Sequence, residues 1–136
     1  MRYLAIDYGL KRTGLAICDN SETVVSPLKV IQSREKLLEK IPEIIEAENV
    51  QAVVIGMPLN MDNSQGSQAE IVLKFAERLK TRLQIPVHFQ DERLSSFGAE
   101  QKFASAGFTK KQKTTRLDAL AAAEILQAFL DSKHNC

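Results

Sequence analysis

Three acidic segments of the sequence carry side chains that can bind metal ions. Asp7 lies in D-Y-G-L-K-R-T-G, Asp91 and Glu92 begin D-E-R-L-S-S, and Asp118 lies in T-T-R-L-D-A-L-A-A-A. As ligands, carboxylate oxygens favour Mg²⁺ or Mn²⁺, and the chain has too few histidines and cysteines to suggest a softer metal. Two such ions, roughly 4 Å apart, can hold the attacking and leaving oxygens of a phosphodiester during hydrolysis. If the fold brings these carboxylates together, they predict a divalent-metal phosphodiesterase site.

Each segment also has a purely structural interpretation, which the residues alone leave open. Gly9 would let a ligand approach the backbone, but D-x-G is equally typical of a hairpin turn. Asp91 and Glu92 lie on opposite sides of a strand, so only one would face a shared site, and the other could form a salt bridge. Thr115 and Asp118 have the spacing of a capping box, in which Asp118 would accept a backbone N–H at a helix start.

Basic residues flank the same segments. They are Lys11, Arg12, Arg93, Lys110, Lys111, Lys113 and Arg116. Such cations could track a nucleic-acid backbone and make binding sensitive to salt, although a solvated basic loop is the alternative for FTKKQKTTR. The formal net charge is only +1, so affinity for nucleic acid would have to come from this local cluster. Two tyrosines and no tryptophan argue against an extended platform for stacking bases.

Size and composition predict one ordinary soluble domain. The 136 residues suit a single domain, 1–136, with a short tail at about 132–136. No apolar run approaches the roughly 20 residues of a membrane span, and no secretory leader is recognisable, so a cytoplasmic location is expected. Cys18 and Cys136 lack the spacing of a zinc site and are expected to be free thiols.

Hydrophobic periodicity predicts the elements that would position the acids. Strands are expected at 2–7, 13–19, 24–30, 51–57 and 86–92, helices at 34–47, 69–83, 97–105 and 114–132, and a basic loop at 109–113. Pro27 indicates an edge strand, and Pro42 predicts a kink or break in the first helix. The order predicts an α/β fold: a three-strand meander and two crossovers, forming a mixed five-stranded sheet with helices on both faces.

The strand order brings two of the acidic segments to one edge of this sheet. Ligands of such sheets bind beyond the carboxyl ends of parallel strands, where Asp7 and the pair Asp91–Glu92 are expected. The alanines that follow Asp118 leave a helix face small enough to press against the sheet and carry that acid toward Asp7.

Four motifs in this order resemble the YqgF/RuvX family of bacterial RNase H-like proteins. They are D-Y-G-L-K-R-T-G, G-M-P-L-N-M-D with G-S-Q-A-E after it, D-E-R-L-S-S, and L-D-A-L-A-A-A-E-I-L-Q-A-F-L, and the resemblance extends over 1–130. It implies an RNase H-like fold with sheet order 3-2-1-4-5 and strand 2 antiparallel. It also implies a metal site carried by Asp7, Glu92 and Asp118, with Asp91 in reserve. Three residues match the family's G-x-P-x-N loop near the cleft: Gly56, Pro58 and Asn60.

The family is described both as Holliday junction resolvases and as nucleases that process the 5′ end of pre-16S ribosomal RNA. The resemblance therefore implies a metal-dependent endo- or exonuclease, with rRNA processing as the first expectation and junction resolution as the alternative. A trimming enzyme could be a monomer or a weak homodimer, whereas a resolvase requires a two-fold dimer. A non-catalytic nucleic-acid-binding module is the second alternative. The D-x-G turn also resembles the phosphate loop of actin-like and sugar-kinase ATPases, but the chain has no room for their second domain.

Overall fold

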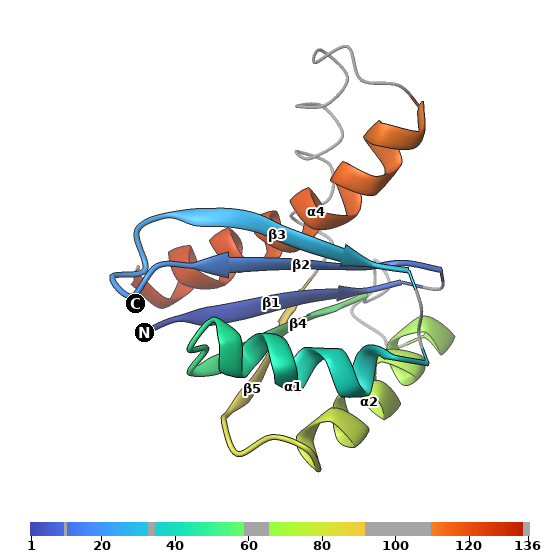
Figure 1. Cartoon of the computed structure of the whole chain (residues 1–136), viewed down its shortest axis with the longest axis horizontal. Coiled ribbons are helices and arrows are strands. Elements are labelled where there is room, and N and C mark those ends of the chain that lie inside the picture. Colours follow the sequence, from blue (N-terminus) through green and yellow to red (C-terminus); the bar gives the residue numbers. More distant parts are fainter. Residues whose placement is uncertain (10, 33–34, 59–65, 92–109, 135–136) are drawn as a thin grey trace.

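A five-stranded mixed sheet forms the centre of the molecule (Figure 1). The computed structural model describes residues 1–9, 11–32, 35–58, 66–91 and 110–134, and for 110–118 the backbone only. The strands are β1 (Tyr3–Tyr8), β2 (Thr13–Cys18), β3 (Val25–Ile31), β4 (Ala52–Met57) and β5 (Val87–Asp91). Their order is β3-β2-β1-β4-β5, in which β2 is antiparallel to its neighbours and β4 is parallel to β1 and β5. The predicted order and directions are confirmed.

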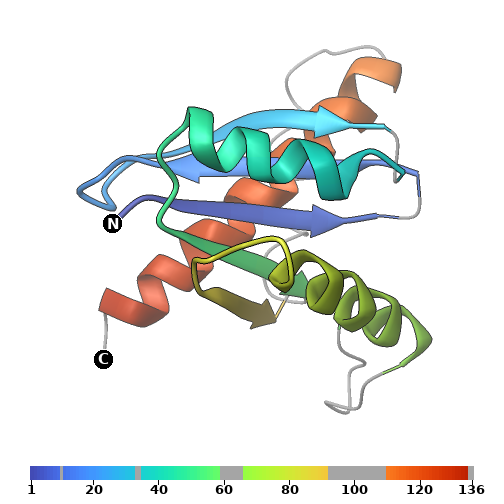
Figure 2. The same cartoon turned by 60° about the horizontal axis from the view of Figure 1, so that its bottom comes forward.

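Helices cover both faces of the sheet, as predicted. α1 (Leu37–Ala47) and α2 (Ser67–Lys80) pack on one face, and α4 (Lys110–His134) crosses the other (Figure 2). We call these the α1/α2 face and the α4 face. Side chains alternate along each strand, so Leu4 and Ile6 enter the core under α1 and α2, whereas Tyr3 and Ala5 face α4. No helix in the described ranges has the length and apolar character of a membrane span.

The strands differ in burial according to their place in the sheet. β2 and β4 are buried along their whole length, and for β4 this agrees with its continuous run of apolar, β-branched residues, which is typical of a strand covered on both faces. β3 is exposed or half-buried at every residue except Ile31 and forms an edge, which confirms the interpretation of Pro27, since a proline has no N–H to donate to a ladder. The β2–β3 register shifts between Leu15 and Ala16, where Pro27 lies opposite Ala16.

Two helix predictions differ from the structure. α1 continues through Pro42, so the predicted break is wrong and the kink stays a prediction; the buried side chains of Leu37 and Ile41 hold the helix on the sheet despite the missing N–H. The basic loop predicted at 109–113 is also wrong, because α4 begins at Lys110. Lysine and glutamine are strong helix formers, so such a run is compatible with a helix as well as with a loop. The helix predicted at 97–105 lies outside the described residues.

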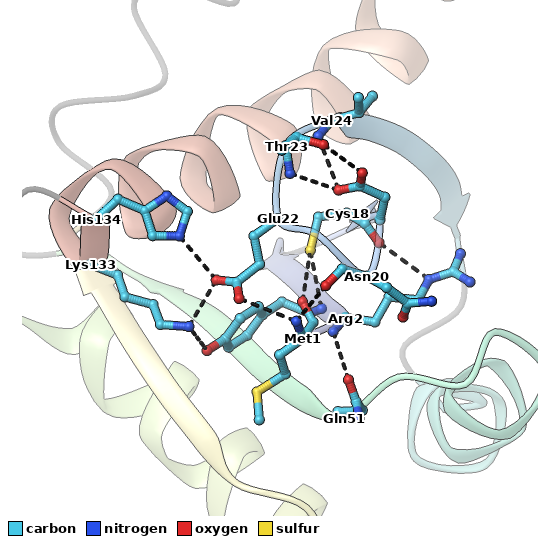
Figure 3. Close-up of polar contacts among 12 residues, drawn as sticks. Met1, Arg2, Cys18, Asn20, Glu22, Thr23, Val24, Gln51, Lys133 and His134 are labelled. Carbon is cyan, nitrogen blue, oxygen red and sulfur yellow. Dashed lines mark hydrogen bonds and ion pairs between the residues drawn. The ribbon is translucent and has the colours of Figure 1, made fainter.

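α4 ends at His134, two residues past the predicted helix end. A cluster of polar contacts around Glu22 holds this end of the helix (Figure 3). The Glu22 carboxylate accepts hydrogen bonds from Lys133 Nζ at 2.8 Å and from the N-terminal ammonium of Met1 at 3.2 Å, and lies 3.2 Å from His134 Nε2. Lys133 Nζ also donates to the Tyr3 hydroxyl at 2.9 Å. The hydrogen bond from Lys133 is the main reason that the pKa of Glu22 falls to about 2. This Glu22 cluster ties the end of α4 to the start of β1.

Cys18 lies beside the Glu22 cluster and is a free, buried thiol, as predicted. Its Sγ accepts the backbone N–H of Tyr3 at 3.3 Å and lies 3.5 Å from the carbonyl oxygen of Met1. Burial raises the pKa of the Cys18 thiol, so the sulfur stays protonated and serves as a packing group.

Candidate metal centre

Asp7 lies at the carboxyl end of β1 on the α4 face and is half-buried. Its partner across the β1–β2 ladder is Gly14. On the other side, Ile6 pairs with Ile55, so the next position on β4, Gly56, lies beside Asp7. The residues flanking Asp7 on both neighbouring strands therefore have no side chain, and both glycines are buried. Gly14 was not singled out from the sequence, because its role depends on the register of the hairpin.

The strand register separates Asp91 from Asp7. Asp91 pairs with Met57, which belongs to the core under α1 and α2, whereas Asp7 continues the series of Tyr3 and Ala5 that faces α4. Paired residues on parallel strands share a face, so Asp91 and Asp7 lie on opposite faces of the sheet. Glu92 itself lies outside the described residues.

The backbone at Asp118 lies inside α4 and not at a helix start. Because α4 begins at Lys110, Asp118 is two turns into the helix, and the capping-box interpretation of Thr115 and Asp118 is wrong. α4 crosses the strands obliquely (Figure 2). Phe129 packs edge-on against Tyr3 at the start of β1, with ring centroids 5.2 Å apart. From there the helix runs back toward the carboxyl end of β1, so position 118 lies toward the same end of the sheet as Asp7.

The alanines that follow position 118 bring α4 close to the sheet, as predicted. Ala122 is fully buried, and Ala119 and Ala123 are each 7% exposed. Ala122 and Ala123 share a core with Ala5 and Ala16, so small side chains meet small side chains where the helix crosses β1 and β2. Small contacts of this kind allow the closest approach of a helix backbone to a sheet.

The turn between β1 and β2 carries the first two predicted cations. Lys11 is exposed and Arg12 is half-buried. Gly9 is required by the turn itself, because a Cβ atom there would overlap the carbonyl oxygen of Arg12. The hairpin interpretation thus accounts for Gly9, while the same turn holds both cations beside the carboxyl end of β1.

The remaining predicted residues are described in part or not at all. Pro58 is half-buried and directly follows β4. Lys110, Lys111, Lys113 and Arg116 belong to the first turns of α4, for which only the backbone is described. Asn60 and Arg93 lie outside the described residues. Among the side chains that are described, no three acids, histidines or cysteines gather into a metal-binding group.

Comparisons with solved structures agree with the observed fold. Thermus thermophilus RuvC in complex with a Holliday junction substrate superposes with a TM-score of 0.63 at 14% identity, covering 98% of this chain and 96% of that one. The fowlpox virus resolvase in its complex with Holliday junction DNA gives a TM-score of 0.61 at 14% identity, covering 98% and 99%. At this identity the similarity establishes the fold, and the RNase H-like assignment is confirmed.

Sequence comparisons place the chain more narrowly. A protein of Anaeromyxobacter sp. named "Putative pre-16S rRNA nuclease" is 42% identical, with 98% of this chain and 99% of that protein covered. A protein of the same name from Maridesulfovibrio salexigens is 39% identical, with 96% and 98% covered. The family model RuvX, described as Holliday junction resolvase, matches residues 1–132. With a family match over nearly its whole length and relatives of the same size, the chain belongs to the RuvX (YqgF) family.

Proposed function

We propose that this protein is a divalent-metal-dependent nuclease that hydrolyses phosphodiester bonds of RNA during maturation of the 5′ end of pre-16S rRNA in the cytoplasm. The observation that carries the proposal is the position of Asp7. Its carboxylate lies at the carboxyl end of a buried strand, on the α4 face, between Gly14 and the position of Gly56. A carboxylate held this rigidly on a strand, between two glycines, suits a catalytic metal.

The proposed ligands are Asp7, Glu92 and Asp118. The strand register supports Glu92 over Asp91, because Asp91 is on the face opposite Asp7 and the next strand position would return to the α4 face. The course of α4 supports Asp118, whose backbone lies toward the same end of the sheet as Asp7. An all-carboxylate ligand set fits Mg²⁺ or Mn²⁺, and two ions suit the chemistry.

The chain contributes positioning and charge to the reaction. Bound divalent ions supply a water of lowered pKa and a Lewis acid for the phosphate oxygens. The β1–β2 turn presents Arg12 and Lys11 to a phosphate near Asp7, and a guanidinium can grip two phosphate oxygens at once. Arg93, Lys113 and Arg116 are proposed to bind further phosphates of the nucleic acid, and Gly56, Pro58 and Asn60 to belong to the cleft. The phosphodiester is thus held in line with the attacking water.

RNA is the proposed substrate because the relatives that align over nearly their whole length carry an rRNA-nuclease name. Resolution of four-way DNA junctions is the second candidate, favoured by the description of the family model. A resolvase cuts two strands symmetrically and needs a two-fold dimer, so the oligomeric state on the substrate separates the two functions.

The proposal is tested by cleavage of end-labelled substrates in Mn²⁺, Mg²⁺ or EDTA. The substrates are a pre-16S 5′ leader, an unrelated single-stranded RNA and a four-way DNA junction. Metal-dependent cutting of the leader by the wild type, lost in Asp7→Asn, is the expected result. Preferential cutting of the junction by a dimer would support the resolvase. Silence of wild type and variant on every substrate, with intact RNA binding, would make the protein a non-catalytic module.

A further inference from the structure

A pocket lies on the α1/α2 face at the carboxyl end of β1, on the side of the sheet opposite Asp7. Its volume is about 200 Å³. Its walls come from the end of β1, the first turn of α1 and the middle of α2: Tyr8, Leu38, Ile71, Lys74, Phe75 and Arg78. The residues proposed to bind metal do not line it, so it is a separate feature of the same end of the sheet.

One wall of the pocket is a stacked pair of aromatic rings. The rings of Tyr8 and Phe75 lie 4.1 Å apart, centroid to centroid, and are inclined by only 11°. Phe75 is 6% exposed and belongs to the core, so it fixes the plane of the Tyr8 ring from below. Tyr8 itself is half-buried and borders the pocket. A flat aromatic surface held in this way favours a flat aromatic ligand.

The other chemical feature of the pocket is a pair of cations. Lys74 and Arg78 are one turn apart on α2, and both are exposed. Among the described residues, the pocket lining includes no acidic side chain, and neither cation forms an ion pair with an acid. An anion placed between the two cations would interact favourably with both. Apolar walls with a few convergent polar groups are typical of a ligand site.

We propose that this pocket binds one unpaired nucleotide of the nucleic-acid strand that the protein cleaves. The base packs against Tyr8 and Leu38, and the adjoining phosphate lies between Lys74 and Arg78. The inference rests on the proposed nuclease function, because that function identifies the bound nucleic acid as the strand to be cleaved. Asp7 and Tyr8 are consecutive on β1 and face opposite sides of the sheet. A nucleic-acid strand bound at both residues would therefore bend around the end of the sheet.

The pocket chemistry distinguishes this ligand from others. A purely apolar ligand would make no favourable contact with the two cations. A phosphorylated peptide would bind the cations but would not stack on the aromatic wall. A nucleotide uses both features. The same chemistry is present in a free nucleoside monophosphate, so the experiment includes adenosine monophosphate beside a short single-stranded oligoadenylate.

Binding is measured in EDTA, so that cleavage does not enter. Fluorescence anisotropy of labelled oligoadenylate is compared between wild type, Lys74→Gln/Arg78→Gln, and the control Lys80→Gln/Arg82→Gln. The control removes the same charge from the end of α2, where Lys80 lies over the Phe89 ring. The pocket variant should bind roughly 10-fold more weakly at low salt, and the slope of log K against log salt should fall by about 1 to 1.5. The control should change neither by as much.

Fluorine NMR locates the nucleotide. The chain has two tyrosines, Tyr3 and Tyr8, so fluorotyrosine labelling gives two signals, which Tyr3→Phe assigns. The Tyr8 signal should shift with saturation by oligoadenylate, and the Tyr3 signal at the opposite end of β1 should not. If the Tyr8 signal shifts with oligoadenylate and not with adenosine monophosphate, the pocket binds a nucleotide of a strand. If both shift the signal equally at similar concentration, the pocket binds a free nucleotide, and the proposal that its ligand belongs to the cleaved strand is overturned.

Failure of the inference is separable from failure of the nuclease proposal. If the pocket variant binds like the control and Tyr8 does not shift, the inference is overturned, whatever the cleavage assay gives. If cleavage is absent but Tyr8 shifts with the strand and binding depends on Lys74 and Arg78, the pocket stands and the nuclease proposal falls.

Discussion

Asp7 is paired with Gly14 across the antiparallel ladder of β1 and β2, so no side chain lies beside the carboxylate on that strand. Both residues face α4, as do Ala5 and Ala16 two residues along each strand. The glycine beside Asp7 is therefore placed there by the register of a tight hairpin.

Replacing Gly14 by alanine should place a methyl group beside Asp7. The added methyl group should weaken Mn²⁺ binding about 10-fold or more, an effect of the size seen for changes next to metal ligands. Stability should fall as well, by about 1–3 kcal/mol, because Gly14 is buried and the added group must displace its neighbours. Calorimetric titration with Mn²⁺ and thermal unfolding check the two expectations. Unchanged Mn²⁺ affinity would show that no bound ion lies beside Gly14.

Gly9→Ala should destabilise the hairpin that carries Lys11 and Arg12. A Cβ atom at Gly9 would overlap the carbonyl oxygen of Arg12, so the turn must open, at a cost of about 1–3 kcal/mol. Urea denaturation measures the loss. Lys11→Ala is the matched control, since its exposed side chain in the same turn should change the free energy of unfolding by no more than about 0.5 kcal/mol. Equal stability of the two variants would contradict the overlap.

Ala122→Leu should push α4 away from the sheet. Ala122 is fully buried, so a larger side chain should cost about 1–3 kcal/mol. The shift should also weaken Mn²⁺ binding, because α4 carries Asp118. Ala121→Leu, at a partly exposed position of the same helix, is the control and should affect both quantities less. Mn²⁺ affinity that survives in a folded Ala122→Leu protein would argue against Asp118 as a ligand.

The Glu22 cluster predicts a defined dependence of stability on acid. The folded pKa of Glu22 is about 2, below its ordinary 4.5, chiefly because of the hydrogen bond from Lys133. The ionised carboxylate therefore stabilises the fold above about pH 4.5, and this stabilisation is lost as pH falls through about 2. Glu22→Gln should lower Tm at neutral pH, and the difference from wild type should vanish toward pH 2.

A second acid titrates over the same range and remains in both proteins. Hydrogen bonds from Thr23 and Val24, led by the Thr23 hydroxyl, lower the pKa of Asp19 to about 2. The informative quantity is therefore the difference in Tm between wild type and Glu22→Gln at each pH. A difference that is constant from neutral pH down to about 2 would contradict the assignment to the Glu22 carboxylate.

The sheet could be predicted from the sequence because its signals are local. Short turns predict the antiparallel meander, a proline indicates the edge strand, and the apolar, β-branched run that follows Gln51 indicates a strand covered on both faces. The start of α4 could not be predicted in the same way. Lysines and glutamines permit both a solvated loop and a helix, and the choice depends on helix propensity and on packing further along the chain.

The candidate site could be predicted as a set of residue types but not as a geometry. Asp7 was identified by its place at a strand end. The face on which Asp91 lies depends on the β4–β5 register, and the place of Gly14 beside Asp7 depends on the β1–β2 register. Tyr8 and Phe75 are far apart in sequence and meet only because α2 returns over the end of β1. Their stacking left no pattern in the sequence.

The most direct test of the account compares single-turnover cleavage of a pre-16S leader by four variants in Mn²⁺. Asp7→Asn, Glu92→Gln and Asp118→Asn remove the proposed ligands, and Asp91→Asn removes a neighbouring acid on the opposite face of the sheet. The account predicts that the first three lose cleavage by several orders of magnitude while remaining folded, and that Asp91→Asn keeps a rate close to wild type. Full loss in Asp91→Asn with retained cleavage in Glu92→Gln, or cleavage that survives in Asp7→Asn, would contradict it.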